Sequence, residues 1–143
     1  RQMCIRDRYQ VARDFGSNDK PAQIFAGARS ADRLYFTEDC KDIAEVHIAT
    51  DDGSAGFNGR VTDALRDYLK TLDADTLAKT EFYNCGPEPM IHAAEAVQRE
   101  FVEASQTFSA IDYTTKCGVG ICGACASPDG RRICVDGPFI NTH

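Results

Sequence analysis

Four cysteines close to the C-terminus constrain this chain more than any other feature. Cys117, Cys122, Cys125 and Cys134 follow the spacing C-x4-C-x2-C-x8-C, and they are four of the seven cysteines in 143 residues. Three glycines stand among the first three of these cysteines, Gly118, Gly120 and Gly123. Residues without a Cβ let the backbone wrap closely around a bound group, and amide N–H groups can then point at the sulfurs. The segment therefore predicts a centre held by four thiolates.

The spacing favours one kind of centre over the others. Plant-type ferredoxins hold a 2Fe-2S cluster through four cysteines that begin with this C-x4-C-x2-C run. A zinc site usually pairs two C-x2-C knuckles, and this segment has one. A disulfide framework needs an oxidising compartment, and no secretory signal is visible. We interpret the four cysteines as ligands of a 2Fe-2S cluster, with zinc or scattered structural cysteines as the alternatives.

Composition excludes several classes of partner. The formal net charge of −6 argues against nucleic acid and against an anionic membrane surface. No run of eighteen apolar residues exists that could span a bilayer. Seven cysteines without a secretory signal indicate a reducing interior, so we expect a cytoplasmic protein whose thiols are kept for metal.

The hydrophobic pattern before the cysteines predicts alternating strands and helices. Strands are expected at 22–27, 45–50, 80–84 and 108–113, and helices at 31–40, 59–72 and 90–101. Ser30 is expected to cap the first of these helices. Strands separated by helices of this length require crossover connections and a parallel sheet. The fold class is therefore α/β, with a small cluster-binding lobe after the sheet.

Ligands of such sheets bind outside the carboxyl ends of the strands. Three loops follow strands here, at 27–30, 51–56 and 85–89, and all three are rich in Gly, Pro or Asp. The pattern predicts a nucleotide-binding type of sheet.

Four segments together resemble a known family. They are Gly27–Ser30, the run from Ala49 to Gly56, Cys85–Met90, and the cysteine segment that ends in Cys134-Val-Asp-Gly-Pro138. In this order they are similar to the electron-transfer subunits of NAD-dependent (class 1B) dihydroorotate dehydrogenases, members of the ferredoxin-reductase superfamily. The resemblance runs from about Tyr9 to Ile140.

The resemblance implies a function and its cofactors. In that family FAD lies on an N-terminal barrel, NAD on the parallel-sheet domain and a 2Fe-2S cluster on a C-terminal lobe. Electrons pass from an FMN-containing catalytic subunit, which oxidises dihydroorotate to orotate in pyrimidine synthesis, through the cluster and FAD to NAD. The expected partner is that catalytic subunit, in a heterotetramer. We therefore expect an oxidoreductase that acts as a subunit of a complex.

The family pattern also implies site residues. The four cysteines carry over as the cluster ligands. Cys85, Gly86 and Pro87 would lie near the nicotinamide, and Thr50 and Asp51 would face the adenosine ribose. The other expected cofactor contacts are Gly27, Arg29 and Gly53. No catalytic side chain is predicted, because hydride and electron transfer are carried by cofactors.

Asp51 gives a prediction about the nucleotide. Relatives that use NADPH tend to place a basic residue there to pair with the 2′-phosphate. A carboxylate would repel that phosphate and could accept a hydrogen bond from a 2′-hydroxyl, so we expect NAD rather than NADP. The alternative is that Asp51 and Asp52 are solvated turn residues.

Departures from the family pattern suggest an N-terminally truncated chain. The FAD barrel is absent, and so is the first strand of the nucleotide domain with its glycine-rich loop. Residues 1–8 stand in its place without a glycine, and we leave them unassigned and possibly non-native. The expected domains are a partial NAD-binding domain at 9–108, with an unpaired strand edge, and a cluster lobe at 109–143. The short gap before Cys134 requires a tight hairpin at 127–130.

Two other functions are kept as alternatives. One is a related reductase subunit, serving a hydrogenase or forming the flavin subunit of a ferredoxin–NADP oxidoreductase. The other is a cluster-bearing redox module without turnover, which predicts a cluster but no nicotinamide binding.

Overall fold

The structure is a computed structural model that describes residues 10, 12–14, 22–35, 37–110 and 113–141. The predicted status of residues 1–8 lies outside the described residues. The chain divides into two units, Arg1–Asp73 and Ala74–His143, which are described separately below. The predicted domain boundary at 108/109 stays a prediction.

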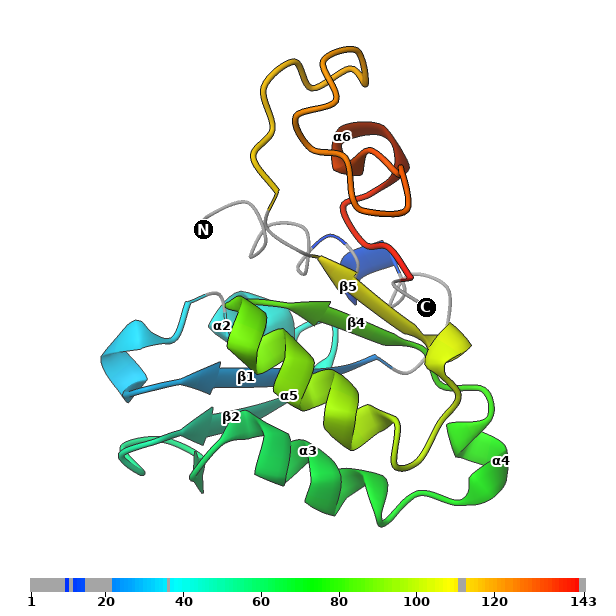
Figure 1. The fold of residues 1–143 in the computed structure, drawn as a ribbon. Coiled ribbons are helices and arrows are strands. Elements are labelled where there is room, and N and C mark those ends of the chain that lie inside the picture. Colours follow the sequence, from blue (N-terminus) through cyan, green and yellow to red (C-terminus); the bar gives the residue numbers. More distant parts are fainter. Residues whose placement is uncertain (1–9, 11, 15–21, 36, 111–112, 142–143) are drawn as a thin grey trace. The chain divides into compact units, whose positions relative to one another are not determined.

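The first unit is built on parallel strands (Figure 1). Strand β1 (Gln23–Ala28) pairs with β2 (Glu45–Thr50) along its whole length, and the short β3 (Phe57–Asn58) pairs with the end of β2. Both ladders are parallel, which confirms the predicted direction, and β1 is displaced by one residue from its predicted start. The carboxyl ends of β1 and β2 therefore meet at one edge, where the predicted nucleotide loops begin.

Alternate residues of β1 face two different helices, as the period of a strand requires. Ile24 is buried in a cluster with Cys40 of α2 (Thr37–Lys41). Phe25 points the other way and its ring lies 5.3 Å from that of Tyr68 on α3 (Val61–Leu69). Helix α3 is shorter than the predicted 59–72, but its stripe of Leu65 and Leu69 is buried as expected.

The predicted helix at 31–40 is wrong in its first half. A short 3-10 turn, η1 (Ala31–Arg33), is followed by Leu34 in an extended conformation, and only α2 is α-helical. Ser30 stands before the turn but makes no side-chain cap, since its hydroxyl donates to the carboxylate of Asp32. Side-chain bonds of this local kind compete with helix formation.

The second unit pairs β4 (Phe82–Cys85) with β5 (Thr107–Ala110) in a parallel ladder, and α5 (Glu88–Gln98) packs on both strands (Figure 1). These elements confirm the predicted strand, helix, strand order. The last strand ends earlier than the predicted 108–113, and residues 111–112 lie outside the described part. The remaining elements are α4 (Ala74–Leu77), η2 (Ala104–Gln106) and α6 (Ile133–Asp136).

A polar network lies beneath α5. Asn84 of β4 and Gln98 exchange two amide hydrogen bonds, of 2.9 and 2.8 Å. The Ser109 hydroxyl of β5 donates to Glu95 over 2.6 Å, and Glu95, Gln98 and Ser109 are buried. Buried polar groups that satisfy one another specify a single packing. The network therefore fixes α5, and with it the loop 85–87 that leads into the helix.

The cysteine segment returns to this sheet at its far end. Ser109 and Ile140 form an antiparallel bridge, with N–H···O distances of 2.9 and 3.2 Å. The Asn141 side chain donates to the carbonyl oxygens of Ala104 and Ser105. The segment between β5 and Ile140 is thus anchored to β5 at both of its ends.

The described ladders form two parallel sheets, β1-β2-β3 and β4-β5. Within the described residues β1 has β2 as its one ladder partner, and the expected unpaired edge stays a prediction. No helix in this part of the chain has the length and apolar character that crossing a bilayer requires.

Candidate functional site

The loop that carries the first three cysteines has a conformation that depends on glycine. Gly120 is buried and has a φ of +75°. A Cβ at this position would lie 2.7 Å from the Cγ2 of Val135 and 3.3 Å from the Nη1 of Arg132. Only glycine fits both the left-handed backbone and this close approach.

The acidity of the thiols is linked in two pairs. The side chain of Cys122 lies close enough to Cys117, and that of Cys134 close enough to Cys125, to influence the pKa of those thiols. A two-iron cluster with four cysteine ligands needs two thiolates for each iron. The pairing of the donor set therefore fits a 2Fe-2S cluster.

Backbone N–H groups point at the sulfurs, as expected from the glycine-rich sequence. Gly120 N–H donates to the Sγ of Cys134 over 3.2 Å. The N–H groups of Ile121 and Cys122 donate to the Sγ of Cys117 over 3.4 and 3.5 Å. Such bonds stabilise negative charge on sulfur, which a thiolate ligand carries.

The same bonds set the acidity of the thiols. The backbone N–H of Cys122 is the largest cause that lowers the pKa of Cys117 to about 6. The N–H of Cys134 lowers the pKa of Cys125, whereas the hydrogen bond to the Cys125 side chain raises the pKa of Cys134. One thiol of each pair is therefore the more readily ionised in the free protein.

Exposure differs among the four cysteines. Cys125 is 2% exposed, Cys134 is half-buried, and Cys117 and Cys122 are exposed. Within the described ranges, no three Cys, His, Asp or Glu side chains gather closely enough to hold a single metal ion.

The predicted hairpin before Cys134 is confirmed. Gly130 N–H donates to the carbonyl of Ser127 over 2.9 Å, and Ala126 and Arg132 form an antiparallel bridge. The Arg131 guanidinium binds Asp129 and also donates to the carbonyl of Asn141. The hairpin thus brings Cys134 back beside Cys125 and ties the segment to its anchored end.

The first two predicted nucleotide loops are joined to each other in the first unit. Ala31 N–H, after β1, donates to the hydroxyl of Ser54 over 2.8 Å. Asp52 accepts from the N–H and the hydroxyl of Ser54, and these bonds lower the pKa of Asp52. Ser54 was not among the predicted site residues, although the spacing Asp52-x-Ser54 is typical of such a turn.

Thr50 and Asp51 have different environments. Thr50 is fully buried, and its hydroxyl donates to the carbonyl of Ala55 and accepts from the Ala55 N–H. Asp51 is exposed. Thr50 therefore shapes the loop, whereas Asp51 is accessible to a ligand. Of the other predicted contacts in this unit, Gly27 lies within β1, Arg29 and Gly53 lie on the loops after β1 and β2, and all three are exposed.

The third predicted loop lies in the second unit, between β4 and α5. Cys85 and Gly86 are half-buried and Pro87 is exposed at the start of the helix. A Cβ on Gly86 would lie 2.2 Å from the Cε of Met90. The backbone and Met90 of α5 therefore come close together at this turn.

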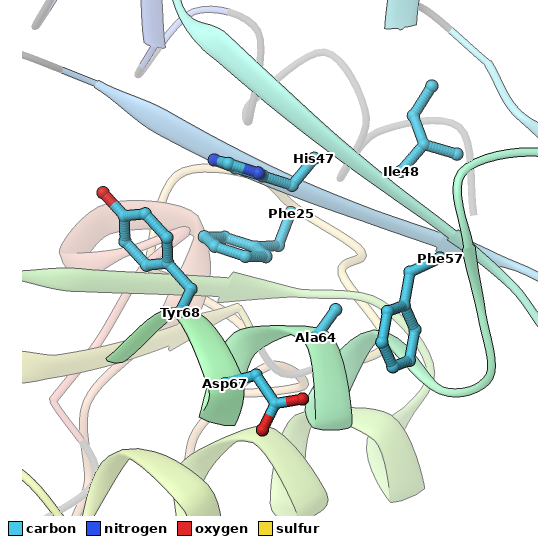
Figure 2. A pocket seen from close by; sticks show the side chains of 7 residues that line it. All are labelled: Phe25, His47, Ile48, Phe57, Ala64, Asp67 and Tyr68. Atoms are coloured by element: carbon cyan, nitrogen blue, oxygen red, sulfur yellow. The ribbon is translucent and has the colours of Figure 1, made fainter. Parts of the chain in front are cut away.

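A hollow of about 290 Å³ between the β1–β2 face and α3 was not expected from the sequence (Figure 2). The His47 ring stacks on Phe25 at 4.6 Å, with Tyr68 beside both. His47 is hydrogen-bonded to Gln23 and Asp67 pairs with Lys70. Two of the polar side chains that line the hollow, His47 and Asp67, are thus already engaged, and none of the predicted cofactor contacts lines it.

Sequence comparison assigns the two parts of the chain. Residues 5–96 match the profile of the oxidoreductase NAD-binding domain. The chain belongs to the oxidoreductase NAD-binding family. Residues 114–143 match a second profile, the iron-sulfur cluster binding domain of dihydroorotate dehydrogenase B. The two matches confirm the α/β nucleotide domain and the cluster lobe.

Individual relatives agree with these profiles. The chain is 35% identical over 133 residues to the probable dihydroorotate dehydrogenase B (NAD(+)), electron transfer subunit, of Methanocella arvoryzae, covering 92% of this chain and 48% of that protein. It is 31% identical over 136 residues to the corresponding subunit of Fusobacterium nucleatum, covering 91% and 49%. The chain thus spans about half the length of the curated relatives it matches.

A solved structure of an NADH-dependent reduced ferredoxin-NADP oxidoreductase is similar in fold. The TM-score is 0.73 at 28% sequence identity, over 92% of this chain and 46% of that one. This likeness confirms that the chain has a fold of the ferredoxin-reductase type.

Proposed function

We propose that this chain is part of an electron-transfer subunit that carries electrons from an FMN-containing dihydroorotate dehydrogenase subunit to NAD, in pyrimidine synthesis. The observation that carries the proposal is a glycine-rich loop whose N–H groups donate to the Sγ of Cys134 and Cys117, in a segment similar to the cluster domain of dihydroorotate dehydrogenase B. The assignment to the cytoplasm follows from thiols that must stay reduced to hold iron.

In this proposal Cys117, Cys122, Cys125 and Cys134 hold the cluster. A bound 2Fe-2S cluster supplies a one-electron carrier. The N–H groups of Gly120 and Ile121 stabilise the charge on the sulfurs, and the hairpin at 127–130 keeps Cys134 within reach. FAD, the third cofactor of the family, is proposed for the whole subunit and is assigned to no residue here.

The loops after β1, β2 and β4 are proposed to contact NAD. Nucleotides bind at the carboxyl ends of parallel strands. In the first unit the proposed contacts are Gly27 near the end of β1, Arg29 after it and Gly53 after β2. In the second unit they are Cys85 at the end of β4, followed by Gly86 and Pro87. Asp51 is proposed to accept a hydrogen bond from the adenosine ribose, with Thr50 holding the loop behind it.

Asp51→Asn is expected to reduce the preference for NADH over NADPH about tenfold, because it removes a carboxylate that repels the 2′-phosphate. Fluorescence titration of both nucleotides measures the ratio of dissociation constants. Asp52→Asn is the matched control. Asp52 is bonded to Ser54, so this change should weaken both nucleotides alike. An unchanged ratio in Asp51→Asn would show that Asp51 is a solvated turn residue.

Three large apolar side chains of the cysteine segment are exposed. Ile121 is 84% exposed, Val119 64% and Val135 53%. Exposed apolar groups gathered in one segment are typical of interaction surfaces. We assign this surface to the FMN-containing subunit, in a heterotetramer, because the similar relatives are named as subunits and a carrier must lie close to its electron donor.

Mixing the iron-loaded chain anaerobically with that FMN subunit and dihydroorotate tests the proposal. The EPR signal of the reduced cluster should appear without NAD. Ile121→Asp should weaken co-elution of the two proteins at least tenfold, by burying a charge in the contact. Lys79→Asp, on an exposed residue outside the cysteine segment, should leave co-elution unchanged. A cluster that stays oxidised would contradict the proposed partner.

A second candidate is a subunit of a ferredoxin–NADP oxidoreductase or of a hydrogenase-linked reductase. The fold similarity to the reduced ferredoxin-NADP oxidoreductase favours it. In that case reduced ferredoxin, and not dihydroorotate with the FMN subunit, should reduce the cluster. A cluster that accepts electrons while the chain binds no nicotinamide nucleotide would instead indicate a redox module without turnover.

A further inference from the structure

Gly120 links the two pairs of sulfurs. Its own N–H donates to the Sγ of Cys134 over 3.2 Å. The next peptide, which joins Gly120 to Ile121, donates its N–H to the Sγ of Cys117 over 3.4 Å. The orientation of these two successive peptides therefore governs one hydrogen bond to each pair.

Arg132 holds the second of these peptides. Its Nη1 donates to the Gly120 carbonyl oxygen over 2.6 Å. The peptide thus accepts a charge-assisted hydrogen bond at its oxygen and donates at its nitrogen to Cys117. Hydrogen bonds in such a chain polarise one another, so the guanidinium strengthens the Ile121 N–H as a donor to sulfur.

The backbone of Arg132 is fixed beside the loop, and its guanidinium lies close to Gly120. The Arg132 backbone N–H donates to Asp136 over 2.6 Å, and Arg132 lies in the bridge with Ala126 that closes the hairpin. The Cζ of Arg132 lies 3.4 Å from where a Cβ of Gly120 would be. This contact requires glycine at position 120.

Its neighbour Arg131 has a different role. Arg131 binds the carboxylate of Asp129 and the carbonyl of Asn141. No hydrogen bond from Arg131 to the cysteine loop 117–125 is found among the described residues. The two adjacent arginines thus provide a comparison in which the same charge is removed at two places.

We propose that Arg132 is a positioning residue that orients the Gly120–Ile121 peptide toward Cys117 and so raises the reduction potential of the cluster. The inference rests on the proposed function, because it requires a cluster at these cysteines. Reduction adds one electron to the cluster, and N–H donors to its sulfurs stabilise the added charge. Because Arg132 is exposed, its charge acts through this hydrogen bond rather than through space, where solvent screens it.

The test is a potentiometric titration followed by EPR, with mediator dyes, on the iron-loaded 143-residue chain. In Arg132→Gln the ratio of reduced to oxidised cluster at a fixed potential should fall about fivefold, the effect of losing one hydrogen bond. Arg132→Lys keeps a charged donor and should recover part of the ratio. Arg131→Gln, the matched control, should change it by less than about twofold.

The outcomes separate this inference from the proposed function. No 2Fe-2S spectrum in the unsubstituted chain would overturn both. A normal spectrum with equal potentials in Arg132→Gln and Arg131→Gln would overturn the role of Arg132 alone. Loss of the cluster in Arg132→Gln, with retention in Arg132→Lys and Arg131→Gln, would support the positioning role. Loss in all three variants would overturn it.

Discussion

Cys125→Ser is expected to abolish the visible absorbance and the EPR signal of the reduced chain, and to lower its iron content at least about tenfold. Cys125 is the most deeply buried of the four thiols and the partner of Cys134. A serine hydroxyl in its place is a poor ligand for iron, and a cluster missing one of four thiolates is not retained. Iron and sulfide assays after anaerobic reconstitution, together with EPR of the dithionite-reduced sample, measure the effect.

Cys85→Ser is the matched control for this experiment. Cys85 lies on β4, outside the four cysteines of the cluster segment. The same substitution should therefore leave about two irons per chain. A full spectrum in Cys125→Ser would contradict the four-cysteine assignment. A colourless unsubstituted chain with one zinc would favour the zinc alternative.

Gly56→Ala is expected to lower the free energy of unfolding by about 3 kcal/mol, through backbone strain and overpacking. Gly56 has a φ of +65°, and a Cβ there would lie 2.1 Å from the carbonyl oxygen of Ile48 on β2. The obstacle is backbone within a paired strand, so no rotamer change relieves it. Thermal and urea unfolding followed by circular dichroism measure the loss, and NADH titration should show weaker binding.

Gly130→Ala separates steric contact from backbone conformation. Gly130 also has a positive φ, of +85°, but no atom lies within 4 Å of where its Cβ would be. The free energy of unfolding of this variant should fall by only about 1 kcal/mol, the cost of placing alanine in a left-handed conformation. Equal losses in the two variants would mean that the loop 51–56 can move away from β2.

Patterns that follow from burial were predictable from the sequence. The strand at 45–50 was predicted with its observed bounds, because a short apolar run between polar turns has few other solutions. The cysteine spacing and the hairpin at 127–130 were equally specific. These features depend on neighbours along the chain, which a sequence shows directly.

Features that depend on contacts between distant residues were not predictable. The break at Leu34 separates two short helical pieces that the sequence pattern joins into one. Thr50 is buried and its hydroxyl bonds to Ala55. From the sequence alone, a threonine at the end of a strand that bonds to its own loop looks the same as one that contacts a ligand. Arg132 is one of two adjacent arginines, and only the direction of its guanidinium sets it apart.

The bridge between Ser109 and Ile140 makes residues 110–139 a closed loop whose ends meet on one strand. Closing such a loop costs conformational entropy. The bonds that offset this cost are backbone hydrogen bonds and those of the Asn141 side chain, and they do not involve the cysteines. Loss of iron would therefore loosen the loop locally and leave the β4–β5 pair folded. Folding of the β4–β5 unit and assembly of the cluster are therefore separable events.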